Sequence, residues 1–448
     1  MNGRLAFDIS WVDPERARGA ELAATWASLR VTVSSDSEQS ACLTEIHDRS
    51  TGSAREYVFV PLYPLAEWIV SNWWHILYEP EGIELNRTSP DFQRRHNMLH
   101  AGDGYFFPSV VLIADGEGND GLIEVVPEAR STPLRRYILP EVPFLAIETV
   151  RAREDLSAFV DAVVGRLEDR GIHGTYLQDE WSEILRLDAE LGDFCRYTAM
   201  AGLDPNDIDD ETANEFARIA GIVPRNEWNA LFSNAGPSLD SLRAAATSLV
   251  SSKEHLQSVD LATPVVSDLR ERLRGFEAPR PWLSGYKIAR EVRTMLSIEQ
   301  QRFGSFESLQ HVFGLQDAHR DEIMRFVPDL PVDGVVGVNT AGGLGVDMKA
   351  RDGNEAPHNF LFCRCVAEFL LNGSDAQHIV SRSKNARQKL NRAFAAEFLA
   401  PAELLRTSVS TPSVSLEEIE QLGVDFGVSV MVIAHQLENH RIAVPEPY

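Results

Sequence analysis

The sequence contains little cysteine and no long hydrophobic run. The four cysteines, Cys42, Cys195, Cys363 and Cys365, are too few and too scattered for a disulfide framework. The first residues lack a basic stretch followed by an apolar stretch, so they do not predict a signal peptide. No uninterrupted apolar run approaches the ~20 residues that a membrane span requires. These absences predict a soluble protein of the reducing cytoplasm.

Positive charge is also scarce. The 448 residues include 42 Lys and Arg against 67 Asp and Glu, which gives a formal net charge of −25. Because phosphate binding requires clustered Lys and Arg, this balance argues against nucleic acid as a direct, non-specific ligand, although it does not exclude a local basic patch. Hydrophobic residues make up 44% of the chain, so each domain can bury a core.

The hydrophobic periodicity predicts an α+β protein with three domains. Residues 1–150 read as a mixed α/β domain of unknown role, with a helix over 15–28, a strand over 29–33 and a hairpin that turns at 115–121. Residues 151–280 read as a helical region, because apolar residues recur there at helical spacing. Residues 281–448 form a third domain that combines helices with two short strands.

Two features outside the third domain's helices carry specific expectations. Trp68, Trp73, Trp74 and Tyr78 predict core packing in preference to an aromatic recognition surface, and we expect either Trp73 or Trp74 to be partly exposed because the two are adjacent. The glycine-rich segment 340–345 lacks the Lys-Ser/Thr sequel of a phosphate-binding loop and predicts a hairpin turn.

The third domain is organised around the stretch 360–401. Residues 360–371 are apolar enough for a buried helix, and residues 391–401 predict a second helix that stops at Pro401. Ser415 and Glu418 have the spacing of a capping box and predict the start of another helix.

The order of features in the last third of the chain resembles the ImmA/IrrE family of zinc metallopeptidases. Five segments carry the resemblance in sequence order: 285–293, 330–334, 360–371, 392–401 and 423–438. The resemblance implies a zincin-like fold, a role in cytoplasmic regulation, and a protein partner such as a repressor, an antitoxin or a component of a mobile-element or defence system.

The departures from the family pattern fall on the chemistry. Arg364 stands where the family has its first zinc-binding histidine, Cys365 where it has the general-base glutamate, and Glu368 where it has the second histidine. Residues 385–392 contain no acid that could serve as the third ligand, and the resemblance gives Glu397 a structural position. The sequence therefore predicts no catalytic residue and no cofactor.

The substituted residues suggest what replaces the metal. Arginine is always protonated and offers no lone pair to a metal. Arg364 and Glu368 stand four residues apart and share a helix face, so they can pair. We therefore expect a catalytically degenerate pseudometallopeptidase, in which an ion pair occupies the zinc position and the protein holds a partner without cleaving it.

Two alternatives stay open. The first is an active zinc metallopeptidase with an atypical site, for which the weak ligand candidates are His96, His100, His358, Cys365 and Glu368. The histidines at 96 and 100 have zincin spacing, with Asp103 as a third candidate ligand, but Asn97 stands where a general base is needed and an amide cannot take the proton. The second is a sensor whose N-terminal domain binds a small ligand.

Overall fold

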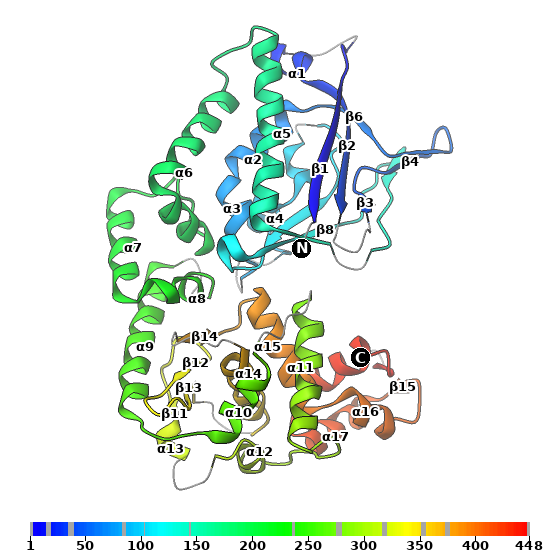
Figure 1. Cartoon of the computed structure of the whole chain (residues 1–448). Helices are drawn as coiled ribbons and strands as arrows, with labels where there is room; N and C mark the ends of the chain where they lie inside the picture. Colours follow the sequence, from blue (N-terminus) through cyan, green and yellow to red (C-terminus); the bar gives the residue numbers. More distant parts are fainter. Residues whose placement is uncertain are drawn as a thin grey trace. The chain divides into compact units, whose positions relative to one another are not determined.

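The computed structural model describes residues 3–14, 19–34, 40–82, 87–102, 104–142, 145–234, 238–274, 280–315, 320–350, 355–371 and 377–445 (Figure 1). The protein is α+β, with many helices and several small, mostly antiparallel sheets. The chain forms two compact units, Met1–Ala213 and Asn214–Tyr448. The predicted middle region, 151–280, is divided between them: its first two helices belong to the first unit and its later helices to the second.

The main sheet of the first unit is built around β2 (Trp26–Ser34). This strand pairs antiparallel with β1 (Arg4–Trp11) along one edge, and with β3 (Ser40–Cys42) and β6 (Val58–Pro61) along the other. The predicted helix over 15–28 is wrong in its last part. Residues 15–18 lie outside the described residues, and within 19–28 the helical part is α1 (Ala20–Ala24). From Trp26 onward every second side chain is buried, which is the pattern of a strand.

Buried aromatic side chains hold the helices of the first unit together. Trp68 of α2 (Tyr63–Ser71) and Trp73, Trp74 and Tyr78 of α3 (Trp73–Tyr78) all lie in the core, which confirms the predicted packing. The expectation that Trp73 or Trp74 is partly exposed is wrong, since each is only 2% exposed. The two rings are covered from different sides: Trp73 meets Trp181 edge to face at 5.0 Å, and Trp74 stacks on Tyr78.

The remaining elements of the first unit include the predicted hairpin. Strands β7 (Val110–Ala114) and β8 (Leu122–Pro127) flank the turn, and the Asp115 carboxylate accepts hydrogen bonds from the backbone N–H groups of Glu117 and Leu122 inside it. The other elements of this unit are β4 (Ile46–Asp48), β5 (Ser53–Arg55), α4 (Pro90–His96), β9 (Arg135–Tyr137), β10 (Ala146–Glu148), α5 (Thr149–Asp169) and α6 (Tyr176–Met200).

The second unit contains a four-stranded sheet in the order β11-β13-β12-β14. Its central strands, β12 (Gly334–Val338) and β13 (Leu344–Lys349), form the hairpin that the glycine-rich segment predicts. A Cβ on Gly345 would lie 2.1 Å from Leu256 Cδ2, so the Leu256 side chain would have to shift to admit one. The outer strands are β11 (Met324–Val327) and β14 (His378–Val380).

Three helices of this unit position the candidate site. The two predicted helices are present as α14 (Ala356–Leu371) and α15 (Ala386–Leu399), and both begin earlier than expected. Helix α15 lies along α11 (Pro281–Met295) as well as against α14 (Figure 1). A Cβ on Gly285 of α11 would lie 2.4 Å from the Leu390 carbonyl oxygen, so only glycine permits this approach of the two helices.

Further helices and short strands complete the second unit. The capping box at Ser415 and Glu418 is confirmed at the start of α17. The elements are α7 (Asp210–Ile222), within which the unit boundary falls, α8 (Trp228–Phe232), α9 (Leu239–Ser258), α10 (Pro264–Arg272), α12 (Phe306–Val312), α13 (Arg320–Ile323), α16 (Ala402–Ser408), β15 (Ser413–Val414), α17 (Leu416–Phe426), α18 (Val430–Asn439) and β16 (Val444–Pro445). Among the residues that the structure describes, no helix has both the length and the apolar character needed to cross a bilayer.

Candidate functional site

Arg364 lies in the middle of α14 and is 5% exposed. Its guanidinium group donates hydrogen bonds in three directions. Nε donates to Asn391 Oδ1 at 3.0 Å, Nη1 donates to Asp333 Oδ2 at 3.2 Å, and Nη2 donates to Gln388 Oε1 at 2.8 Å and to the Ser381 carbonyl oxygen. A planar fork of donors satisfied on all sides is what allows a charged arginine to be buried.

Glu368 lies one helical turn beyond Arg364 and is 2% exposed. The Asn391 amide connects the two residues, because its oxygen accepts from Arg364 and its nitrogen donates to Glu368 Oε2 at 3.1 Å. Arg387 Nη1 lies 3.6 Å from Glu368 Oε1. The predicted partnership of Arg364 and Glu368 therefore runs through an amide, and the ion pair of Arg364 is with Asp333.

The charges of this cluster come from separate parts of the chain. Asp333 immediately precedes β12, Arg364 and Glu368 belong to α14, and Arg387 belongs to α15. Burial lowers the pKa of Arg364, and the neighbouring Asp333 carboxylate opposes that shift. Because the ordinary pKa of arginine lies so far above neutrality, the group keeps its proton at physiological pH.

The residues at the position where the resemblance leads us to expect a metal do not fit zinc. Zinc needs deprotonated sulfur, nitrogen or oxygen ligands, and a guanidinium offers none. Cys365 is fully buried, and burial raises the pKa of its thiol, so no thiolate is present at neutral pH. Its sulfur lies against the start of β12, 3.1 Å from the position of a Cβ on Gly334. Among the described residues, no three His, Cys, Asp or Glu side chains are grouped so that they could hold a metal ion.

His358 lies at the other end of α14 from Glu368. Its ring packs among aromatic side chains, with centroid distances of 5.2 Å to Phe326 and 6.1 Å to Phe306. These contacts give His358 a packing role at the start of the helix.

His96 and His100 do not keep the helical spacing that a zincin pair needs. Helix α4 ends at His96, and Asn97 has an extended conformation, with φ −104° and ψ 119°. His96 is fully buried, and its two ring nitrogens lie 3.0 Å from Glu79 Oε2 and 2.8 Å from the Leu112 carbonyl oxygen. His100 lies in the following short 3-10 helix, Met98–Ala101, and Asp103 lies outside the described residues.

Sequence reasoning missed the buried carboxylate that His96 contacts. Arg95 donates two hydrogen bonds to Glu79, and His75 Nδ1 lies 2.7 Å from Glu79 Oε2. Burial by itself raises the pKa of Glu79, but the contacts with His75 and His96 hold it well below its ordinary value. The spacing of His75 and Glu79, four residues apart after the tryptophan pair, is the signal that could have indicated it.

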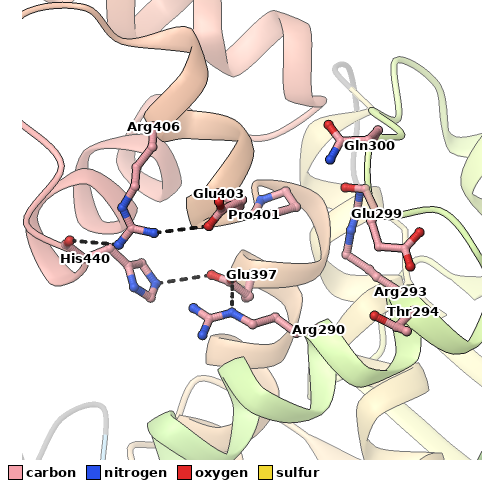
Figure 2. A pocket seen from close by; sticks show the side chains of 10 residues that line it. All are labelled: Arg290, Arg293, Thr294, Glu299, Gln300, Glu397, Pro401, Glu403, Arg406 and His440. Atoms are coloured by element: carbon pink, nitrogen blue, oxygen red, sulfur yellow. Dashed lines mark hydrogen bonds and ion pairs between the residues drawn. The ribbon is translucent and has the colours of Figure 1, made fainter.

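A second polar feature of the same unit is a hollow of about 410 Å³ beside α11, α15, α16 and the end of α18 (Figure 2). Glu397 lies buried in its wall and accepts from Arg290 Nε at 2.7 Å and from Gln436 Nε2 at 2.9 Å, while His440 Nε2 lies 3.2 Å away. Burial raises the pKa of Glu397, and His440, Arg290 and Gln436 together bring it below the ordinary value.

The hollow is electrically balanced. Its lining contains three arginines, Arg290, Arg293 and Arg406, and three glutamates, Glu299, Glu397 and Glu403. Figure 2 shows Arg290 and His440 pointing at Glu397, while Arg406 points at Glu403. Glu397 therefore joins α15 to α11 and α18, and the hollow favours neither sign of ligand.

No protein-family model matches the chain, and no curated protein sequence matches it. The resemblance to the ImmA/IrrE family therefore stays a prediction, carried by the order of five sequence segments.

Proposed function

We propose that the second unit is a catalytically degenerate metallopeptidase-like unit, and that the protein acts in the cytoplasm as a regulatory or scaffold protein that holds a protein partner. The observation that supports this most is the buried Arg364 guanidinium at the position of the first zinc ligand. Its hydrogen bonds to Asp333, Asn391, Gln388 and Ser381 use four of its five N–H donors, and the side chain is buried away from any substrate.

Peptide hydrolysis needs an activated water and a group that takes its proton. Arg364 cannot bind the metal that would activate the water, and the buried Cys365 thiol, with its raised pKa, cannot act as a base near neutral pH. Glu368 is the remaining carboxylate on this face of the helix, and it is engaged by Asn391 and Arg387. The arrangement is suited to a fixed shape rather than to proton transfer.

The family resemblance supplies the class of partner. The resemblance implies that the partner is a repressor, an antitoxin or a component of a mobile-element or defence system. In this proposal the partner is held by the surface around α14 and α15 and is released intact.

Zinc content tests the proposal directly. The purified full chain is exposed to excess zinc and then freed of unbound metal. It should contain far less than one zinc ion per chain when measured by inductively coupled plasma mass spectrometry. Near-stoichiometric zinc that is lost in Glu368→Gln and kept in His100→Gln would overturn the proposal. A chelator-sensitive cleavage of candidate repressors by the wild-type protein would overturn it as well.

A further inference from the structure

One segment of this acidic protein carries a net positive charge. Between residues 382 and 392 the chain carries five cations and no acid, although its formal net charge is −25. The cations are Arg382, Lys384, Arg387, Lys389 and Arg392. Two of them are lysines, and the chain's other lysines are Lys253, Lys287 and Lys349.

The five cations differ in their exposure and in their contacts with the protein. Arg387 and Arg392 turn back onto the protein: Arg387 contacts Glu368 and His378, and Arg392 donates to the Ser383 carbonyl oxygen at 2.8 Å. Arg382 and Lys384 are the exposed members, whereas Lys389 on α15 is half-buried, as are Arg387 and Arg392. Arg382 Nε lies 3.8 Å from Asp333 Oδ1, but its side chain is 69% exposed. We call Arg382, Lys384 and Lys389 the basic surface.

The loop that carries Arg382 and Lys384 is fixed by its alternate residues. Ser381, Ser383 and Asn385 are buried, and all three hydrogen bond to Asn234 Oδ1, at 2.9, 2.9 and 3.2 Å. The two exposed cations lie between these three anchors. A loop anchored in this way presents its charges in one arrangement, so little entropy is lost when a partner binds.

The substituted metal position also holds this loop. Arg364 Nη2 donates to the Ser381 carbonyl oxygen, and the Ser381 N–H donates to Gln388 Oε1 at 3.0 Å. Both backbone groups of the residue that precedes Arg382 are therefore engaged by the Arg364 cluster. The guanidinium that replaces a metal ligand thus supports the segment that displays the positive charge.

We propose that the basic surface docks an acidic segment of the protein partner. The inference rests on the proposed function, because it gives the held partner its chemistry. A short acidic segment is favoured over a nucleic acid for a reason of range. Charges in salt interact over about 8–10 Å, so a short segment experiences mainly the basic surface, whereas a long polyanion also meets the acidic remainder of the chain.

Binding of an acidic probe peptide to the full chain is the test. A short fluorescein-labelled peptide of alternating glutamate and serine is titrated by fluorescence anisotropy at low and at physiological salt. The variant Arg382→Ala/Lys384→Ala/Lys389→Ala removes the three cations of the basic surface and should weaken binding by about tenfold at low salt and by less at physiological salt.

A matched control keeps the same change of net charge at other exposed positions. The variant Arg151→Ala/Arg272→Ala/Arg274→Ala removes one cation from α5, one from the end of α10 and one that follows α10, and it should change the affinity by less than about twofold. Equal weakening of both triple variants, or no binding of the peptide by the wild type, would overturn the inference. Tighter binding of a short DNA duplex than of the peptide, lost in the first variant, would overturn it in favour of a nucleic-acid surface.

The zinc measurement separates this inference from the proposed function. A protein that binds neither zinc nor the acidic peptide would refute the docking surface and leave the proposed non-catalytic function standing. A zinc-containing peptidase that binds the peptide through the basic surface would refute the proposed function and leave the docking surface standing.

Discussion

The ion pair of Arg364 and Asp333 should be strongly coupled, and a double-mutant cycle can measure the coupling. Arg364→Met removes the guanidinium and leaves the buried Asp333 carboxylate, together with acceptors on Asn391 and Gln388, without their donor. Breaking a buried pair by removing one partner typically costs about 3–5 kcal/mol. Arg382 Nε lies 3.8 Å from Asp333 but its side chain is 69% exposed, so it compensates only weakly, and we expect a cost towards the lower end.

The second single variant and the double variant complete the cycle. Asp333→Asn keeps the shape and removes the negative charge, so the combination with Arg364→Met leaves no unpaired charge at the site. We expect the double variant to be more stable than the sum of the single costs predicts, by about 1–3 kcal/mol. Arg272→Met, which removes an exposed arginine paired with Asp268 at 2.9 Å, serves as the control and should cause no measurable change.

The readout must report on the second unit alone, because a chain of two compact units need not unfold in a single step. Hydrogen exchange of the α14 and α15 amides, followed by mass spectrometry at increasing urea, gives the free energy of opening for these helices. Costs that simply add in the double variant, or a loss of less than about 1 kcal/mol in Arg364→Met, would refute the reasoning that a charge-saturated cluster replaces the metal.

Two further predictions concern packing and pH. Gly285→Ala should destabilise the second unit by about 1–3 kcal/mol in urea unfolding, because the added Cβ meets the Leu390 carbonyl oxygen. The control Gly165→Ala lies in α5, where a Cβ meets nothing within 4 Å, and should stabilise the first unit slightly. An unchanged stability in Gly285→Ala would contradict the close approach of α11 and α15. The first unit should lose stability as pH falls. Burial gives His96 a folded pKa below its ordinary 6.5, so its contribution is complete above pH 6.5 and declines below it. Glu79, with a folded pKa well below 4.5, adds a loss that begins below pH 4.5. The loss of stability with falling pH, followed as acid unfolding by circular dichroism, should be less steep in Glu79→Gln than in the wild type. An unchanged pH profile in this variant would contradict the role assigned to Glu79.

Local patterns in the sequence predicted the elements beside the site well. The apolar run at 360–371 and the proline stop at 401 indicated α14 and α15, and the glycines at 340–345 indicated the β12–β13 turn. These features depend on residues close in the chain, where helical periodicity, proline and glycine act directly. The last part of the helix expected over 15–28 is a strand instead, because pairing of β2 with strands on both of its edges outweighs the local pattern.

The partners of Arg364 could not be predicted in the same way. Asp333, Ser381 and Asn391 are 31, 17 and 27 residues from it in the chain, and only the tertiary fold brings them together. Spacing on one helix pointed to Glu368, the nearest acid of suitable separation, but a guanidinium can reach across to a neighbouring strand. The histidines at 96 and 100 failed as a pair for a related reason, since a helix ended between them.

The Arg364 guanidinium has a consequence for how the protein would depend on its surroundings. A bound metal ion can be withheld by starvation, extracted by competing proteins or exchanged for another metal, so a fold built around one responds to supply. A positive charge attached to the chain by covalent bonds is delivered with every copy at synthesis and cannot dissociate. Under the proposed function, the interior of the second unit should therefore be complete as soon as it folds, in metal-poor and metal-rich cells alike, and its shape should not depend on zinc.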